Sequence, residues 1–447
     1  MAPFQEVIKR SGARVPFTPI RITNAIYRAA VSVGGRDKKL AEQLTQEVVT
    51  YLENNLKENN PPTVEEIQDA VEKILIENGH ARVAKAYILY RNERARIRDQ
   101  REKQHLGTSS LIPWHKIWQV LDWAASRNLH TIEHFNQRVR SGELPAIVSE
   151  SEMFYEEDLN QAARAIVELR RDVKIVLISG PSSSGKTTTT IKIGQRLANH
   201  GLKLTALNVD NYFFDLEQHP KDEFGDYDFE TPQALDLDLI NDNLVQLISG
   251  KEVLTPRYDF KTGKRQSESL PMNVEKDEII LIDSLHGLYP EMTRAIAPER
   301  KFKLYLEPLL QMKDNLGEYI RWTDIRLLRR MLRDAAYRAY DPEQTLTHWH
   351  YVRSSEIRNI IPNWENADFV INSAMPYELS IYKPKLIDRF REWVEKFNGN
   401  ALREDSFERS VRVLRLLEGL ETVEDDSIVP GDSVIREFIG GSVLNYH

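Results

Sequence analysis

A loop of small residues carries the clearest chemical pattern in the sequence. Residues 180–187 read GPSSSGKT, which matches the G-x-x-x-x-G-K-[ST] spacing of a phosphate-binding loop. The apolar run before the loop predicts a strand, and the run after it predicts a helix. Small residues let backbone N–H groups curl around phosphate oxygens, and a helix N-terminus favours negative charge. The pattern therefore predicts a site for a nucleoside triphosphate.

The two residues that end this loop have separate expected roles. Lys186 is expected to bridge the β- and γ-phosphates, and the Thr187 hydroxyl is expected to hold Mg²⁺. The residues predicted to bind ATP are Gly180, Ser182, Ser183, Ser184, Gly185, Lys186, Thr187 and Thr188.

Two aspartates follow other apolar runs. Asp210 lies in NVDNYFF, after the second run, where a carboxylate can accept the proton of an attacking hydroxyl. Asp283 ends the third run, ILIDSLHG, where it can hold Mg²⁺ directly or through water. Either aspartate alone could be a structural cap, but together with the loop they predict a phosphoryl-transfer site.

A change of pattern at residue 173 marks the domain that would position these residues. Short apolar runs alternate with helical stretches to about residue 400, as in parallel strands buried on both faces. Such a doubly wound α/β domain binds ligands at the carboxyl ends of its strands. The predicted strands are the runs 173–179, 202–209, 278–283, 302–307 and 367–372.

The preceding residues predict a small, mostly helical domain over 1–103. VIKRSGARVPF suits a β-hairpin, because apolar ends flank a Ser-Gly turn. Three stretches of helical periodicity follow, and Thr63 and Glu66 have the spacing of a capping box at the start of the third. The basic stretch 81–103 predicts a long helix, read either as a solvated helix or as the rim of a nucleotide site.

A helical connector is predicted over 104–172, and a C-terminal helix and tail over 401–447. His130 and His134 have helical ligand spacing, but no third ligand is evident, so packing histidines are favoured over a metal site. In the tail, Gly440 and Gly441 suggest either a tight loop near the active site or a terminal packing turn.

Composition excludes several classes of protein. The chain has 447 residues, a net charge of -8, 41% hydrophobic residues and no cysteine. Disulfides, thiolate metal sites and a cysteine nucleophile are therefore excluded, and a cytoplasmic location is expected. No apolar run is long enough for a membrane helix, and the acidic balance gives no reason to expect nucleic acid as a partner.

With these motifs in order, residues 173–375 resemble the uridine kinase family within the wider phosphoribulokinase and uridine kinase group. NVDNYF resembles the family's strand with its catalytic Asp, here Asp210. DFETPQALD places Glu230 at the acidic position that would contact ribose hydroxyls, and PRYDFKTGKR places Tyr258 at the aromatic position that would contact the base.

A lid helix is implied by the same resemblance. DIRLLRRMLRD and YRAYD place Arg330, Arg333 and Arg338 at arginines that would clamp phosphates and substrate. The sequence departs from the family pattern at Gly263, where a His is usual, at Tyr340, where a lid Arg is usual, and at Asp283-Ser284, where Glu-Gly is usual. These departures leave the base recognised by the site open.

The N-terminal hairpin and the following helix resemble the ATP-cone domain over residues 5–97. This resemblance places Lys9 and Arg10 at the basic pair that faces phosphates, and Arg21 in the helix that closes the site. It implies a second nucleotide, ATP or dATP, that regulates activity or assembly, and hence a homo-oligomer.

The sequence thus predicts an ATP- and Mg²⁺-dependent kinase for a nucleoside-like acceptor such as uridine or cytidine. Three alternatives remain: a kinase for another small hydroxyl acceptor, a nucleotide-sensing regulator with little catalytic activity, and a nucleic-acid-binding regulator.

Overall fold

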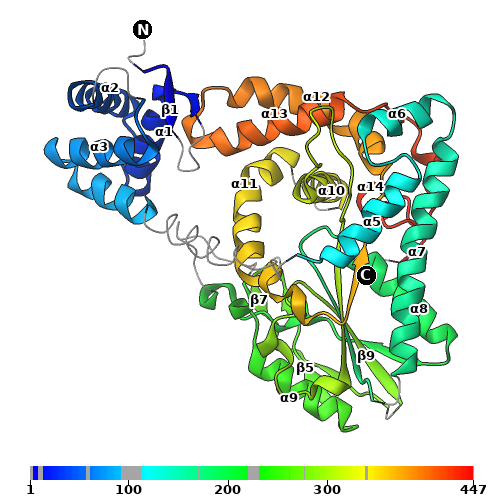
Figure 1. The fold of residues 1–447 in the computed structure, drawn as a ribbon. Coiled ribbons are helices and arrows are strands. Elements are labelled where there is room, and N and C mark those ends of the chain that lie inside the picture. Colours follow the sequence, from blue (N-terminus) through cyan, green and yellow to red (C-terminus); the bar gives the residue numbers. More distant parts are fainter. Residues whose placement is uncertain are drawn as a thin grey trace. The chain divides into compact units, whose positions relative to one another are not determined.

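The computed structural model divides into two compact units, residues 1–109 with 397–407 and residues 110–396 with 408–447 (Figure 1). The residues that it describes are 4–8, 14–56, 61–91, 112–169, 172–219, 231–260, 262–275, 277–337 and 341–445.

The first unit is the predicted hairpin with helices. Strands β1 (Glu6–Ile8) and β2 (Arg14–Pro16) pair antiparallel, with Val7 opposite Val15. Apolar residues at helical spacing bury one face of each helix, which builds a shared core. The helices are α1 (Pro19–Ser32), α2 (Lys38–Asn55), α3 (Val64–Glu77) and a further helical stretch at 81–91.

The capping box predicted in this unit is present at the start of α3. The Thr63 hydroxyl accepts from the Glu66 N–H at 3.1 Å, and the Glu66 carboxylate accepts from the Thr63 N–H at 2.8 Å, so the capping box is confirmed. Arg91, in the helical part of the basic stretch, pairs with Asp69 at 2.6 Å and Glu72 at 2.7 Å on α3. That arginine therefore anchors the last helix.

The second unit is built on a five-stranded parallel sheet, which confirms the predicted fold class. Its order is β11-β10-β3-β9-β4, so the strand before the phosphate loop lies at the centre. All five predicted strands are present, and the central strands β3 and β9 are the most buried, as expected of apolar runs covered on both faces. The strands are β3 (Ile175–Ser179), β4 (Lys203–Ala206), β9 (Glu278–Ser284), β10 (Lys301–Glu307) and β11 (Phe369–Asn372).

Helices cover both faces of this sheet. Helix α8 (Lys186–Asn199) packs with Gly194 against Leu281 of β9. Helix α9 (Leu237–Ile248) shares a buried cluster with Ile280 and Ile282, the neighbours of Leu281 that point to the opposite face. The unit is therefore doubly wound.

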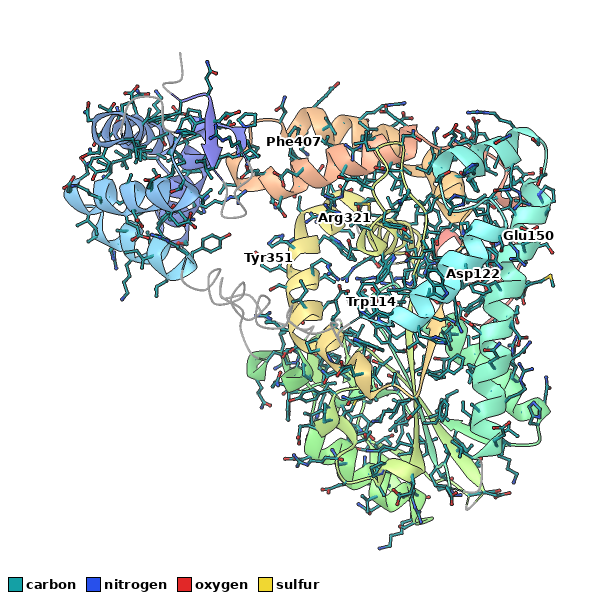
Figure 2. The ribbon with its side chains drawn as sticks, viewed as in Figure 1. Trp114, Asp122, Glu150, Arg321, Tyr351 and Phe407 are labelled. Carbon is teal, nitrogen blue, oxygen red and sulfur yellow. The ribbon has the colours of Figure 1, made fainter. Side chains whose placement is uncertain are left out.

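The predicted connector helices belong to this second unit. They are α5 (Trp114–Ser126), α6 (Ile132–Arg140) and α7 (Leu144–Glu168), and Figure 2 labels Trp114 and Glu150 on two of them. The Lys116 ammonium of α5 pairs with the Asp158 carboxylate of α7, and both side chains are buried. Asp158 in turn accepts from the N–H of Asn372 at the end of β11, at 3.0 Å.

Further helices complete the chain. Among the helices of the described residues, none combines the length and apolar character needed to cross a bilayer. The remaining helices are α10 (Trp322–Tyr337), α11 (Pro342–Ser355), α12 (Glu378–Phe397), α13 (Glu404–Glu418) and α14 (Arg436–Ile439). Short antiparallel pairs join β5 (Val253–Thr255) to β8 (Leu270–Met272) and β6 (Tyr258–Asp259) to β7 (Lys264–Arg265).

Candidate active site

The phosphate loop joins the end of β3 to the start of α8. A side chain at Gly180 would collide with the carbonyl oxygen of Leu306 on the neighbouring strand. Two loop residues have positive φ, Ser183 at 59° and Gly185 at 96°, and this backbone path turns the chain into the helix. The first N–H groups of α8 point out of the helix without intrahelical partners, so they can bind an anion.

The predicted metal ligands lie together beside this loop. Thr187 donates its hydroxyl to the Asp283 carboxylate at 3.4 Å. Burial raises the pKa of Asp283 to about 6, the Lys186 ammonium lowers it, and the carboxylates of Glu437 and Asp210 raise it further. One hydroxyl and one carboxylate form a hard oxygen pair that suits Mg²⁺, which takes its other ligands from phosphate and water.

The lysine of the loop folds back onto it. The Lys186 ammonium donates to the carbonyl oxygen of Pro181 at 3.3 Å and also acts electrostatically on Asp283. A cation held beside the loop neutralises phosphate charge without first having to be brought into place.

Asp210 lies beyond the end of β4, in the short helix η1 (Val209–Tyr212). Its side chain is exposed, and its N–H donates to the Asn208 side chain at 2.9 Å. Because β3 and β4 both run parallel to β9, Asp210 lies at the same edge of the sheet as the phosphate loop, and its charge raises the pKa of Asp283. An exposed carboxylate at this edge can accept a proton from a bound hydroxyl.

Aromatic side chains form a wall next to Asp210. The Tyr258 ring lies 5.6 Å from that of Phe213 and 5.0 Å from that of Phe260. Tyr258 is buried, and burial raises the pKa of its phenol. The Tyr258 N–H donates to the side chain of Asn211 at 3.2 Å, which ties the wall to the residue after Asp210.

One arginine holds this acceptor side together. Arg265 of β7 donates to the carbonyl oxygens of Phe213 and Tyr212, both at 2.7 Å, and pairs with Asp236 at 3.0 Å. Its N–H donates to Asp215 at 2.8 Å. The segment after Asp210 and the β6–β7 hairpin are therefore fixed to each other. Sequence reasoning missed this role, because the partners lie about 30 to 50 residues away.

Gly263 departs from the family pattern for a structural reason. It has a φ of 68°, and a side chain there would begin 3.1 Å from the Leu216 side chain. The Leu216 N–H also donates to the Gly263 carbonyl oxygen at 2.8 Å. A histidine would be strained in this turn.

Two buried arginines of α10 donate hydrogen bonds to carbonyl oxygens of the phosphate loop. Arg326 donates to the Ser182 carbonyl oxygen at 3.0 Å, and Arg329 donates to that of Ser184 at 3.3 Å. Each is neutralised by a buried carboxylate, Glu356 for Arg326 and Glu378 for Arg329. Sequence reasoning named only their neighbours, although the three- and four-residue spacing in DIRLLRRMLRD places the arginines on one helix face.

Two of the predicted lid arginines are within the described residues, and one of them contacts the loop. Arg330 donates to the Ser182 hydroxyl at 3.1 Å and pairs with Asp334. Arg333 pairs with the same aspartate. In the first unit, Arg21 is exposed near the start of α1. The other predicted residues, Lys9, Arg10, Glu230 and Arg338, lie outside the described residues, as does Tyr340.

The connector histidines pack against each other. The rings of His130 and His134 lie 4.8 Å apart, and the His134 ring bonds to the Thr131 hydroxyl at 2.8 Å. Burial lowers the pKa of His130, and the neighbouring His134 and Lys313 lower it further. Within the described residues, no group of three or more His, Asp or Glu is arranged to hold a metal ion.

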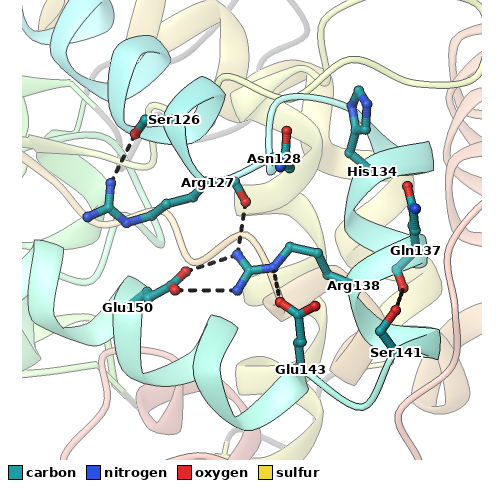
Figure 3. A pocket seen from close by; sticks show the side chains of 9 residues that line it. All are labelled: Ser126, Arg127, Asn128, His134, Gln137, Arg138, Ser141, Glu143 and Glu150. Carbon is teal, nitrogen blue, oxygen red and sulfur yellow. Dashed lines mark hydrogen bonds and ion pairs between the residues drawn. The ribbon is translucent and has the colours of Figure 1, made fainter.

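Residues of helices α5, α6 and α7, and of the turns between them, line a polar pocket (Figure 3). Arg138 crosses it and is neutralised within it, by Glu143 at 2.8 Å and Glu150 at 3.0 Å. None of the residues predicted to bind nucleotide or acceptor lines this pocket.

Comparison with known proteins finds two families on the chain. Residues 5–96 match the family model of the ATP cone domain, and residues 175–379 match that of the phosphoribulokinase / uridine kinase family. The chain is 26% identical over 198 residues to a uridine kinase of Deinococcus deserti, covering 44% of this chain and 86% of that protein.

A second relative matches the N-terminal part. The chain is 46% identical over 103 residues to a vitamin B12-dependent ribonucleoside-diphosphate reductase of Thermoplasma acidophilum, which covers 22% of this chain and 13% of that protein. A solved structure of a possible uridine kinase from Bacillus stearothermophilus aligns with a TM-score of 0.33 at 14% identity, covering 48% of this chain and 98% of that one.

Both resemblances inferred from the motifs are thereby confirmed. The chain combines an ATP cone domain with a kinase domain of the phosphoribulokinase and uridine kinase family. The kinase domain is a phosphotransferase that acts on an alcohol group of a small molecule.

Proposed function

We propose that the kinase domain transfers the γ-phosphoryl group of ATP to the 5′-hydroxyl of a nucleoside, with uridine or cytidine as the expected acceptor. The observation that carries this proposal is the aromatic wall of Phe213, Tyr258 and Phe260. A hydrogen bond ties this wall to Asn211, the residue next to Asp210. Aromatic faces stack on planar bases, so a nucleoside held there has its sugar near a carboxylate.

In this mechanism Asp210 is the general base. It takes the proton of the acceptor hydroxyl as that oxygen attacks the γ-phosphorus. A bond forms between the hydroxyl oxygen and phosphorus, and the bond from phosphorus to the β–γ bridging oxygen breaks, which leaves ADP. Lys186 and the loop N–H groups stabilise the charge that moves onto this oxygen. Arg330, Arg333 and Arg338 close over the phosphates and exclude water.

Thr187 and Asp283 would hold Mg²⁺, since their hard oxygens lie together beside the loop. When bound, the ion supplies positive charge that neutralises the phosphate oxygens. The protein's part is to keep the hydroxyl and the carboxylate together at the end of β9 and the start of α8.

The first experiment is ADP production from ATP and Mg²⁺ by the full chain. The panel contains uridine, cytidine, other nucleosides and no acceptor. ADP that depends on a nucleoside supports the proposal and names the acceptor. ADP formed at one low rate with every compound would contradict it and favour the nucleotide-sensing regulator.

The base is tested by Asp210→Asn with Asp242→Asn as the matched control, since Asp242 is exposed on α9. We expect the first variant to lose turnover by about 10²–10⁴-fold, the usual contribution of a general base, and to keep its affinity for ATP. The control should keep both. Full turnover in Asp210→Asn would show that another group accepts the proton.

One observation favours a second candidate acceptor. The base-contacting side differs from the family pattern, because Gly263 stands where a histidine is usual and its turn, with a φ of 68°, would strain a histidine. A phosphorylated sugar or another small alcohol is therefore included in the panel. Dependence of ADP on such a compound, and not on nucleosides, would identify this second candidate.

We also propose that ATP or dATP at the ATP cone regulates this kinase, through activity or through assembly of a homo-oligomer, in the cytoplasm. The proposal is supported by the match over residues 5–96 and by the basic pair Lys9 and Arg10. The double variant Lys9→Ala/Arg10→Ala should lose the response to adenine nucleotides and keep the ATP dependence of phosphoryl transfer. An unchanged response would refute regulation through this pair.

A further inference from the structure

The C-terminal segment 432–438 is built onto the phosphate loop of the kinase unit. Val434 and Phe438 are fully buried, and Val434 packs so closely on Gly185 that a side chain at this glycine would collide with it. Asp432 pairs with Lys192 of α8 at 2.9 Å. The segment is therefore fixed against the phosphate loop and against α8.

Glu437 from this segment binds the start of helix α8. Its carboxylate accepts from the Thr188 N–H at 3.1 Å and from the Thr188 hydroxyl at 2.9 Å. Glu437 and Thr188 are both buried, with 7% and 0% of their surface exposed. An anion is thus held on the third residue of the helix that begins at Lys186.

Neighbouring contacts fix the position of this carboxylate. Arg436 donates to the carbonyl oxygens of Asp426 at 2.7 Å and Val429 at 2.8 Å, which ties the segment to the residues that precede it. The Phe438 ring lies 5.1 Å from the guanidinium of Arg329, the arginine that supports the loop. Helix α14 therefore packs against α10 as well as against the start of α8.

The donors that Glu437 occupies are of the kind that binds phosphate. The N–H groups of a helix's first turn have no intrahelical partner, and in a loop of this pattern they cradle the α- and β-phosphates. A carboxylate and a phosphate on the same donors would repel each other as well as exclude each other.

We propose that Glu437 competes with the α-phosphate of the donor nucleotide for Thr188, and so sets the affinity of the kinase site for phosphorylated nucleotides. This competition depends on the part of the proposed function that places ATP and ADP in the loop, and is independent of the acceptor.

Calorimetric binding of ADP to the full chain tests this competition. Glu437→Gln removes the charge and keeps an oxygen that can accept from Thr188, whereas Glu437→Ala removes both. Asp432→Asn is the matched control, since it removes one negative charge from the same segment without touching Thr188. Lys186→Ala identifies which part of the isotherm belongs to the kinase site, because the ATP cone can bind nucleotide as well.

We expect Glu437→Ala to bind ADP about tenfold more tightly at the kinase site. Thr188 donates two charge-assisted hydrogen bonds to Glu437, and the loss of one of them alone gives a change of about this size. Glu437→Gln should tighten binding in the same direction, and Asp432→Asn should leave it unchanged. Adenosine, which carries no phosphate, should bind equally well to all of them.

Equal or weaker ADP binding in both Glu437 variants would overturn the competition and make this carboxylate a support of the loop. If one variant loses its cooperative unfolding transition, the other decides. A kinase that phosphorylates no nucleoside at all would refute the proposed acceptor but leave this binding result intact.

Discussion

Replacement of Asp283 by asparagine should stabilise the kinase unit above neutral pH in the absence of ligands. The Asp283 carboxyl is partly buried beside the phosphate loop, and burial is the main cause that raises its pKa from 3.8 to about 6. Folding must then remove a charged group from water whenever Asp283 is ionised. Asparagine avoids this cost, and its amide oxygen can still accept from Thr187.

The pKa shift sets the size of this effect and its pH window. A group with a raised pKa in the folded state adds stability at low pH, and that stability is lost as the pH rises through about 6. A rise of the pKa from 3.8 to about 6 corresponds to about 3 kcal/mol. By linkage, the advantage of Asp283→Asn is about 1.5 kcal/mol at pH 5 and about 3 kcal/mol at pH 8. These values are upper limits, because the carboxylate keeps some contact with solvent.

Urea unfolding followed by tryptophan fluorescence measures this difference in the full chain. All 7 tryptophans lie between residues 114 and 393, within the second compact unit, so the signal reports the kinase unit alone. The wild type and Asp283→Asn are compared from pH 5 to pH 8 in the presence of a chelator, which prevents a divalent cation from neutralising the carboxylate.

Asp242→Asn is the control for this comparison, since it removes a carboxylate that is exposed on α9. Its free energy of unfolding should follow that of the wild type at every pH. The reasoning is refuted if Asp283→Asn is the less stable protein at pH 8, or if its advantage does not grow with pH.

Other substitutions test the support of the loop and the turn at Gly263. Glu378→Gln leaves Arg329 buried without its carboxylate and should lower the free energy of unfolding by about 3–5 kcal/mol, as when one partner of a buried ion pair is removed. The double variant Arg329→Met/Glu378→Leu should recover much of that loss in the same urea titration, and no recovery would contradict the pairing. Gly263→Ala should cost more than the ~1–2 kcal/mol of a left-handed backbone alone, because its side chain also meets Leu216. Gly317→Ala is its control, with a φ of 77° and open space around it, and equal losses in the two variants would exclude the contact with Leu216.

Much of the fold could be predicted because its signals are local. The central strands β3 and β9 are runs of mostly apolar, buried residues, and the Thr63–Glu66 capping box is contained within four residues. The phosphate loop is equally local, since its eight residues join a strand to a helix. The supports of the site are not local. Arg265 reaches two other segments, residues 212–215 and Asp236, and the contact between Glu437 and Thr188 spans 249 residues.

The lid helix shows how part of a site can be predicted while its supports are missed. The pattern DIRLLRRMLRD indicates a row of cations on one helix face, but not which of them meet the loop's carbonyl oxygens and which remain partly exposed. In the structure, the side chains of Arg326 and Arg329 are fully buried, whereas those of Arg330 and Arg333 are partly exposed. This division follows from the carboxylates of Glu356 and Glu378, which lie on other elements and are not part of the motif.

Charged side chains of two separate elements therefore bind the phosphate loop and the start of the helix that follows it. Arginines of α10 bind its carbonyl oxygens, and a carboxylate of the C-terminal segment binds an N–H group at the start of α8. The first contacts leave the donors of the loop available for phosphate, whereas the second occupies one of them. Changes behind the loop should consequently alter stability, while changes at Glu437 should alter nucleotide affinity. A Glu437 variant that lost as much stability as Glu378→Gln, with no change in ADP binding, would place both contacts in the same supporting role.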